Sequence, residues 1–307
     1  TDGSWQYTSS PALSISGSEL VIENNTIISR AASHGIVAGN LNNSIIRNNV
    51  ITGYGNSGEA INVGNNNLIS WNTITDMGKG IIIDGTNNNV IENNSIDVVN
   101  KGISAENIIA SLTIRDNSMS KSNDWFAYIT NADSVTIEDN IFSGDGGDGI
   151  YLNNLTASIM RNLIVTAGTA FEITNGVQAD IVNNTIIGVD ENSDDYAILS
   201  NELSEPVIMN NIIQGFGNGI YVENYILNYG IRHNALWDIS SEMFSGTAMP
   251  SFMGDMIDIN YNGDPSDIMK NINMDPLFVD EDNGDYNLQS DSPGINAGLP
   301  LFSDPDG

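Results

Sequence analysis

Acidic side chains collect in a set of turns near the middle of the chain. These turns carry Asp124, Asp145, Asp148, Asp190, Glu191, Asp194 and Asp195. Calcium takes about six to eight oxygen ligands from flexible loops, so Asp145, Asp148, Asp190 and Asp194 are candidate ligands. A spaced carboxylate pair also suits inverting hydrolysis of a glycosidic bond, with Asp148 and Asp195 as the candidate acid and base. The simpler alternative is that Asp and Gly favour turns whether or not they bind anything.

A second acidic cluster lies close to the end of the chain. It reads Asp280-Glu281-Asp282-Asn283-Gly284-Asp285, with oxygen-bearing side chains around a glycine. The spacing differs from that of an EF-hand loop, but the ligand type is the one that calcium prefers. We therefore expect Asp280, Asp282 and Asp285 to be a further calcium site.

Tyrosines recur in an outward column of short strands. This column contains Tyr128, Tyr151, Glu172 and Tyr221. Aromatic rings bind the apolar faces of sugars while carboxylates bond the sugar hydroxyls, so these four residues are the candidate glycan-binding set. The alternative is that the tyrosines pair across neighbouring strands only to stabilise a sheet.

A repeat must position all of these groups. The motif x-Ile-x-x-Asn-x-Ile returns every 21 to 27 residues, and Leu163 fills the one rung without an asparagine. Its anchor asparagines are Asn25, Asn49, Asn72, Asn94, Asn117, Asn140, Asn184, Asn211 and Asn234. Short β-branched runs at such a period predict a solenoid whose units bury their apolar faces by stacking. Amides stacked at about 4.8 Å would bond one another; glycosylation of the chain's Asn-x-Ser/Thr sequons is the competing interpretation.

Charges alternate two residues before the anchors. We expect Glu92, Arg115, Glu138 and Arg161 to form an outward ladder in which each opposite pair contributes about 0.2–1 kcal/mol. Because the ladder uses arginines, few basic side chains remain for a polysaccharide lyase. Such an enzyme needs a base to remove a proton and cationic groups to neutralise the substrate carboxylate. His34 and His233 lie far apart in the register, and we expect them to be solvated or held in turns.

The net charge and the lack of cysteine limit the kinds of ligand and partner that this chain can bind. The 307 residues include 39 Asp and Glu against 9 Lys and Arg, for a net charge of −30, and no cysteine. Such a field repels nucleic acid and anionic lipid, and the missing cysteines exclude disulfides and thiolate metal sites. No apolar run approaches the length of a membrane span, and the chain opens at Thr1 without a leader, as a mature exported fragment would.

Residues 14–236 resemble the right-handed parallel β-helix repeat family, the pectate-lyase-like superfamily of secreted and surface proteins. The resemblance implies an all-β, right-handed parallel β-helix of about ten coils. The segments Asp275–Asp280, Gly284–Leu288 and Ser292–Gly298 resemble the closing segment of large secreted members. We expect a β-helix over residues 1–238 and an irregular C-terminal cap over residues 239–307.

The predicted function is that of a secreted or cell-surface structural, adhesive or assembly-forming module that is stabilised by calcium and contacts glycans. Polysaccharide or other matrix components are the expected partners, with no nucleic acid, no membrane insertion, and a homo-oligomer or filament as a further option. The alternative is a polysaccharide hydrolase or lyase that uses the acidic turns.

Overall fold

A computed structural model describes residues 10–29, 33–54, 58–83, 88–108, 110–120, 122–189, 194–223, 230–247 and 249–299. The chain divides into two compact units. Unit 1 comprises residues 1–136 and 140–151, and unit 2 comprises residues 137–139 and 152–307. Two long strands, β17 (Trp125–Glu138) and β19 (Asp148–Met160), pass from one unit into the other.

Unit 1 stacks its strands in three parallel files. The first file contains β3 (Val21–Glu23), β6 (Ile45–Arg47), β9 (Leu68–Ser70), β12 (Asn89–Glu92) and β15 (Ser111–Arg115). The second contains β4 (Thr26–Ile28), β7 (Val50–Thr52), β10 (Thr73–Met77), β13 (Ser95–Val98), β16 (Ser118–Ser120) and β18 (Ile141–Ser143). The third contains β1 (Leu13–Ser14), β5 (Ile36–Asn42), β8 (Glu59–Asn65), β11 (Lys79–Ile83), β14 (Ile103–Glu106) and β17, while β2 (Gly17–Ser18) pairs with the end of β5.

Unit 2 repeats the three files. The first contains the end of β19 with β22 (Gln178–Val182), β25 (Val207–Met209) and β28 (Ile231–Arg232). The second contains β20 (Leu163–Thr166), β23 (Thr185–Gly188), β26 (Ile212–Phe216) and β29 (Ala235–Ile239). The third contains β21 (Phe171–Thr174), β24 (Tyr196–Ser200), β27 (Asn218–Val222) and β30 (Phe244–Ser245).

Isoleucine forms the core because each file places the same residue type at the same inward position. In unit 1 the register aligns Ile46 with Ile69 in the first file and Ile51 with Ile74 in the second, and all four are fully buried. β-Branched side chains have few rotamers to lose and pack well on a pleated surface, so stacking them stabilises each coil against its neighbours. The all-β parallel β-helix predicted from the repeat is confirmed.

The anchor asparagines bond one another along the stack. In unit 1 the side-chain Nδ2 atoms of Asn25, Asn49, Asn72, Asn94 and Asn117 each donate to the Oδ1 atom of the next anchor at 2.9 to 3.0 Å. Each anchor from Asn49 onward also donates to a backbone carbonyl of the preceding coil, as Asn94 does to Ile69 at 2.9 Å. This geometry supports amide stacking at the anchor positions.

Unit 2 corrects one rung of the predicted series. The anchor of its first coil is Asn162, which donates to Asn184 Oδ1 at 3.0 Å, so Leu163 does not fill that rung. Leu163 instead begins β20 and pairs with Thr185 in the second file. The sequence interpretation placed this motif one residue too late.

The segment after β30 adds a further rung instead of leaving the stack. Asn234 donates to Asn271 Oδ1 at 3.0 Å, and Ile272 forms a parallel bridge with Ala235. Asn271 then donates its backbone N–H to Asp267 Oδ1 at 2.9 Å and its amide to Asp267 Oδ2 at 3.0 Å. The fully buried carboxylate of Asp267 therefore ends the amide series.

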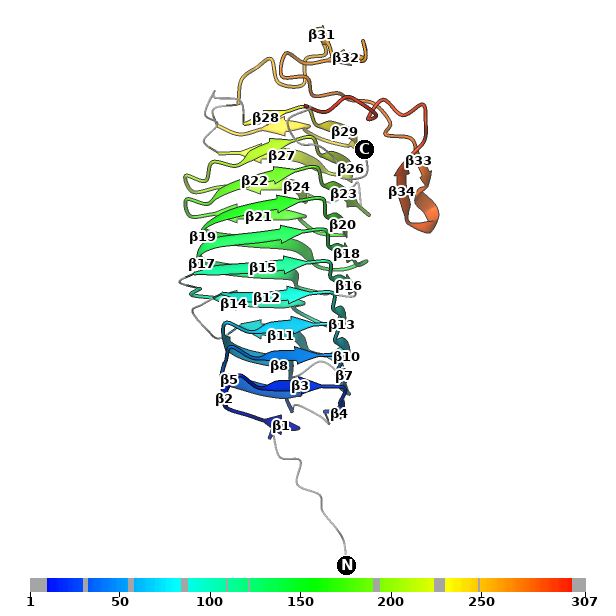
Figure 1. The fold of residues 1–307 in the computed structure, drawn as a ribbon. Coiled ribbons are helices and arrows are strands. Elements are labelled where there is room, and N and C mark those ends of the chain that lie inside the picture. The colour runs from blue at the N-terminus through cyan, green and yellow to red at the C-terminus, as the bar shows by residue number, and fades with distance from the viewer. Residues whose placement is uncertain are drawn as a thin grey trace, which may run out of the picture. The chain divides into compact units, whose positions relative to one another are not determined.

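The remaining tail folds into two small hairpins. One consists of β31 (Asp258–Ile259) and β32 (Pro265–Ser266), and the other of β33 (Phe278–Asp280), the 3-10 turn η1 (Glu281–Asn283) and β34 (Asp285–Leu288). The second hairpin lies beside β20 and β23 of the same unit (Figure 1), where Phe278 packs with Val165 and Ile187. The tail thus covers part of the second file of unit 2.

Candidate binding surfaces

The acidic turns are distributed over both units. In unit 1 the backbone N–H of Asp148 donates to the Asp124 carbonyl at 2.6 Å, and Lys101 Nζ lies 3.9 Å from the Asp124 carboxylate. In unit 2 the Asp195 carboxylate accepts from Thr169 Oγ1 at 3.5 Å. The candidate acid Asp148 and candidate base Asp195 thus belong to different units. Asp190 lies outside the described residues.

The described carboxylates do not assemble a metal site. Among the residues that the structure describes, no group of three or more His, Cys, Asp or Glu side chains could hold a metal ion. In the tail, both Asp280 oxygens accept from Asn283 Nδ2, at 3.0 and 2.8 Å, and Asp285 accepts from Asn287 Nδ2 at 2.6 Å. The calcium sites expected at Asp145, Asp148 and Asp194, and at Asp280, Asp282 and Asp285, are therefore not supported. In the tail, Asp280 and Asp285 bond neighbouring asparagines of their own turn.

The charge ladder departs from the predicted column at Arg161. In unit 1, Arg47 Nε donates to Glu23 at 2.7 Å and Arg115 Nη2 donates to Glu92 at 2.6 Å. In unit 2 the column position belongs to Met160, which pairs with Val182, and Arg161 occupies the next residue, with a positive φ of 55°.

Arg161 nevertheless finds acidic partners from its turn. Its Nε and Nη2 atoms donate to the two Asp139 oxygens at 2.8 and 2.7 Å, and Nη2 also donates to Glu138 at 3.0 Å. The hydrogen bond to Asp139, with smaller contributions from Glu138, raises the pKa of Arg161 above its ordinary value against the opposing effect of burial. Its placement in the ladder was wrong, but the ion pair with Glu138 is present.

Two of the four candidate glycan-binding residues meet in unit 1. The rings of Tyr128 and Tyr151 stack at 4.7 Å between centroids, with 7° between their planes. Lys101 Nζ lies 3.5 Å from the centroid of the Tyr128 ring. Trp125, which sequence analysis missed, meets Tyr151 obliquely at 5.4 Å and 56°. All three rings are partly exposed, and we call Trp125, Tyr128, Tyr151, Lys101 and Asp124 the aromatic surface.

The other two candidates lie apart in unit 2. The register places Glu172 beside Leu199 and Leu199 beside Tyr221, so one coil separates Glu172 from Tyr221. Tyr221 instead meets Tyr196 edge to face at 5.9 Å.

A groove that the repeat did not predict runs between the tail and the turns of unit 2. Two cavities of about 650 and 810 Å³ share Asn183, Thr185, Tyr286 and Asn287 in their linings. One side consists of turn residues that precede the anchors, namely Asp139, Arg161, Asn183 and Asn210, and the other side consists of tail residues including Asp285. We call these two adjoining cavities together the tail groove.

The tail is fixed to the coils on both sides of this groove. Asn210 and Leu299 exchange two hydrogen bonds, at 3.2 and 2.9 Å, and Gln214 donates to Glu281 at 2.8 Å. His233 Nδ1 lies 3.3 Å from the Ala297 carbonyl oxygen, and its ring stacks on Tyr261. No periodicity places these tail residues, which is why sequence analysis did not find the groove.

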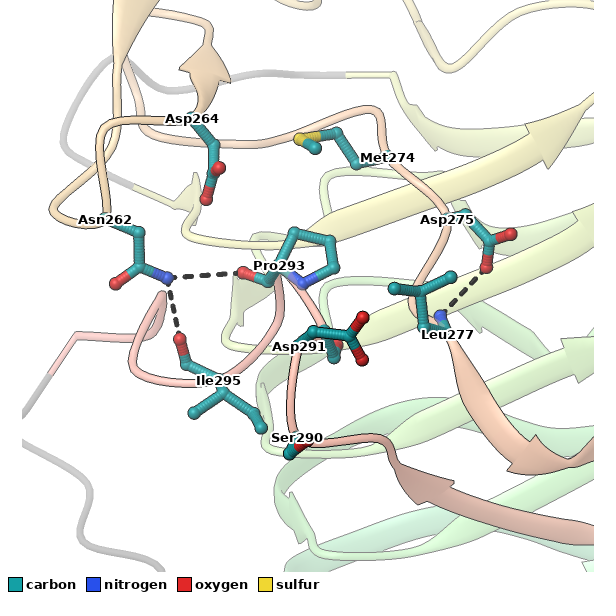
Figure 2. A pocket seen from close by; sticks show the side chains of 10 residues that line it. Asn262, Asp264, Met274, Asp275, Leu277, Ser290, Asp291, Pro293 and Ile295 are labelled. Atoms are coloured by element: carbon teal, nitrogen blue, oxygen red, sulfur yellow. Dashed lines mark hydrogen bonds between the residues drawn. The ribbon is translucent and has the colours of Figure 1, made fainter.

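A third cavity of about 530 Å³ lies within the tail itself (Figure 2). Asn262 donates to the carbonyls of Pro293 and Ile295, at 3.4 and 2.6 Å, and closes one side. Asp264, Asp275 and Asp291 give the lining a negative charge, and Asp275 accepts from the Leu277 backbone at 2.8 Å. These carboxylates do not form a metal-holding group among the described residues.

Stacked parallel files, amide-bonded turns and a closing tail define a parallel β-helix repeat protein. The NosD family model, described as periplasmic copper-binding protein (NosD), matches residues 18–229, which is more than half of the chain. The chain therefore belongs to this family, and its secreted or surface localisation agrees with that of a periplasmic protein. No curated protein and no solved structure matches it. In the described part of the chain, no helix is long and apolar enough to cross a membrane.

The described residues do not assemble the ligand set that Cu(II) usually takes. Cu(II) prefers imidazole nitrogen and oxygen ligands in tetragonal sites, whereas Cu(I) takes thiolate or the thioether of methionine. The chain has no cysteine and two histidines, His34 in unit 1 and His233 in unit 2. The described residues thus offer no Cu(II) site built from the usual ligands.

Proposed function

We propose that this protein is a non-catalytic, adhesive β-helix module that binds neutral polysaccharide outside the cytoplasm through the aromatic surface of unit 1. The observation that carries the proposal is the cluster of three partly exposed rings, Trp125, Tyr128 and Tyr151, beside the Lys101–Asp124 pair. Rings with polar groups at their edges are the usual composition of sugar-binding surfaces.

The three rings have different parts in this proposal. Tyr128 has Tyr151 against one face and the Lys101 ammonium over its ring, so it offers its hydroxyl edge to a ligand and not an open face. Trp125 meets Tyr151 at 56°, so its indole keeps a face that Tyr151 does not cover. Trp125 is therefore the residue on which a pyranose would stack.

Charge favours a neutral polymer. Lys101 is already close to Asp124, and the chain as a whole carries a net charge of −30. A polyuronate would meet a repulsive field, whereas a neutral glycan would not.

Affinity electrophoresis in gels that contain β-glucan, xylan, mannan or polygalacturonate tests the proposal. We expect a neutral polysaccharide to retard the protein and Trp125→Ala to reduce the retardation. The matched control is Trp71→Asn, because Trp71 is 60% exposed and the turns of adjacent coils carry asparagine at its position. Equal retardation of the Trp125→Ala variant, or a preference for polygalacturonate, would refute the proposal.

Reducing-end release on the same polymers tests the non-catalytic part. We expect no release by the unmodified chain. Release that is lost on Asp148→Asn or Asp195→Asn would replace the binding module with a hydrolase.

A further inference from the structure

We propose that the tail groove of unit 2 is a second binding site, separate from the aromatic surface, that takes a short neutral oligosaccharide chain. The shape of the groove gives the first argument. Asp139, Arg161, Asn183 and Asn210 each precede the anchor of a successive coil, and all four line its cavities. Coils stack at about 4.8 Å, so this side is about 14 Å long, which suits a chain of sugars better than one sugar.

The polar groups at the centre of the groove suit hydroxyls. Asn183, Thr185 and Tyr286 line both cavities. No described residue forms a hydrogen bond with the Asn183 side-chain amide, the Thr185 hydroxyl or the Tyr286 hydroxyl. Amides and hydroxyls both donate and accept, as sugar hydroxyls do, whereas a purely ionic ligand would need fixed charges of one sign.

An aromatic ring faces the same centre. Tyr286 packs edge to face on Phe278 at 5.2 Å and 88°, which fixes the ring against the coil face. Burial, with a smaller effect from Glu281, raises the pKa of Tyr286, so its hydroxyl remains a donor at neutral pH. A fixed ring with a protonated hydroxyl can contact both the C–H face and the hydroxyls of a sugar.

The charged groups exclude acidic sugars. Asp139, Asp285 and Arg161 are the charged residues in the two linings, and Glu138 and Asp139 already neutralise Arg161. A uronate would meet excess negative charge with no unpaired cation, so the neutral chain is favoured.

Titration calorimetry on the whole chain provides the test, with neutral hexasaccharides of β-glucan, xylan and mannan and with hexagalacturonate as probes. We expect at least one neutral hexasaccharide to bind and hexagalacturonate not to bind. Asn183→Gly deletes the amide and keeps the positive φ of 55°. Loss of one hydrogen bond should weaken binding about fivefold, and Tyr286→Phe should have a similar effect.

Two variants serve as controls. Asn93 occupies the same turn position in unit 1 with φ 56°, so Asn93→Gly makes the same backbone change away from the groove. Tyr54 is 72% exposed in unit 1, so Tyr54→Phe deletes a hydroxyl elsewhere. Both should bind as the parent does, and melting midpoints confirm that every variant is folded.

The outcomes separate this site from the aromatic surface. Loss of hexasaccharide binding in Trp125→Ala but not in Asn183→Gly would overturn the groove site and leave the proposed function standing. Gel retardation by polymers without any hexasaccharide binding would do the same. Hexasaccharide binding that Asn183→Gly weakens and Trp125→Ala does not would establish the groove even if the proposed function failed.

Discussion

A single asparagine satisfies several backbone groups at each tight turn. Asn117 donates its amide to the carbonyls of Ile91 and Arg115 while bonding Asn140 Oδ1. The residue before each anchor has a positive φ, as in Asn93 and Asp116, where Asn and Asp tolerate the left-handed region best. The anchor amide therefore supplies partners for carbonyls that the bend would otherwise leave unpaired inside the stack.

Asp267 gives the sharpest prediction at this scale. Its carboxylate accepts from the N–H and amide of Asn271 and from the Gly254 N–H at 3.1 Å. Asp267→Ala would leave buried donors unpaired and should lower the free energy of unfolding by about 3 kcal/mol, whereas Asp267→Asn, which keeps an acceptor oxygen, should cost about half as much. Urea unfolding measures both; equal losses would show that Asp267 is not the terminal acceptor.

His233 predicts a pH dependence. Burial lowers the pKa of His233, as do Arg232 and Lys270, against opposing effects of the Ala297 carbonyl and Asp267. The folded state therefore favours the neutral ring. Its contribution to stability is complete above the unfolded pKa of about 6.5 and decreases as pH falls towards the lower folded pKa. His233→Asn should lose less stability between pH 7.5 and pH 5 than the parent, which melting midpoints in matched buffers will show.

Among the elements, neighbouring third-file strands approach one another closely at Gly80. A Cβ built on Gly80 would lie 2.3 Å from the Gly102 carbonyl oxygen and 2.9 Å from Ile96 Cγ2. A methyl group on Gly80 would therefore require the neighbouring backbone of the next coil to shift.

We expect Gly80→Ala to destabilise unit 1 by about 1–3 kcal/mol, because backbone atoms must move to admit the methyl group. Gly39→Ala is the control, since its Cβ would meet Asn62 Oδ1 at an ordinary 3.5 Å. Chemical unfolding of the two variants provides the comparison. Similar midpoints would contradict the close-approach argument.

The strands could be predicted from sequence to the extent that they repeat. The anchor series identified the inward isoleucines and the turns, because periodicity encodes both. The prediction was wrong in one coil, where it placed Leu163 at the anchor position. The anchor is Asn162, and Arg161 is therefore the turn residue before it. Trp125 was missed because it lies outside the tyrosine column, and the tail groove was missed because non-periodic contacts such as Phe278 on Val165 position the tail.

For the whole molecule, charge is the dominant property. Local pairs such as Arg47 with Glu23 and Arg115 with Glu92 use several of the 9 cations, and 39 acidic residues remain largely uncompensated. Self-repulsion at such a net charge opposes the compact state. Exposed ion pairs contribute little in compensation.

Salt should therefore stabilise this protein. Raising sodium chloride from about 0.01 to 0.15 M shortens the Debye length from about 30 to 8 Å and should raise the melting midpoint. Sucrose at matched osmolality is the control for non-ionic effects. A midpoint that falls with salt would mean that the local ion pairs outweigh the net repulsion.

The amide series has a direction, and this bears on how such a chain can change in length. Each anchor side chain donates to the Oδ1 atom of the next anchor and accepts at its own Oδ1 from the previous one. Every interior coil therefore makes the same pair of amide bonds with its two neighbours. Duplicating a coil of the gene in register would lengthen the protein without creating an unmatched amide. A copy placed beyond Asp267 would find no free acceptor, because that carboxylate already receives the last donors. Duplication of a coil can therefore lengthen the stack at interior positions but not at its C-terminal end.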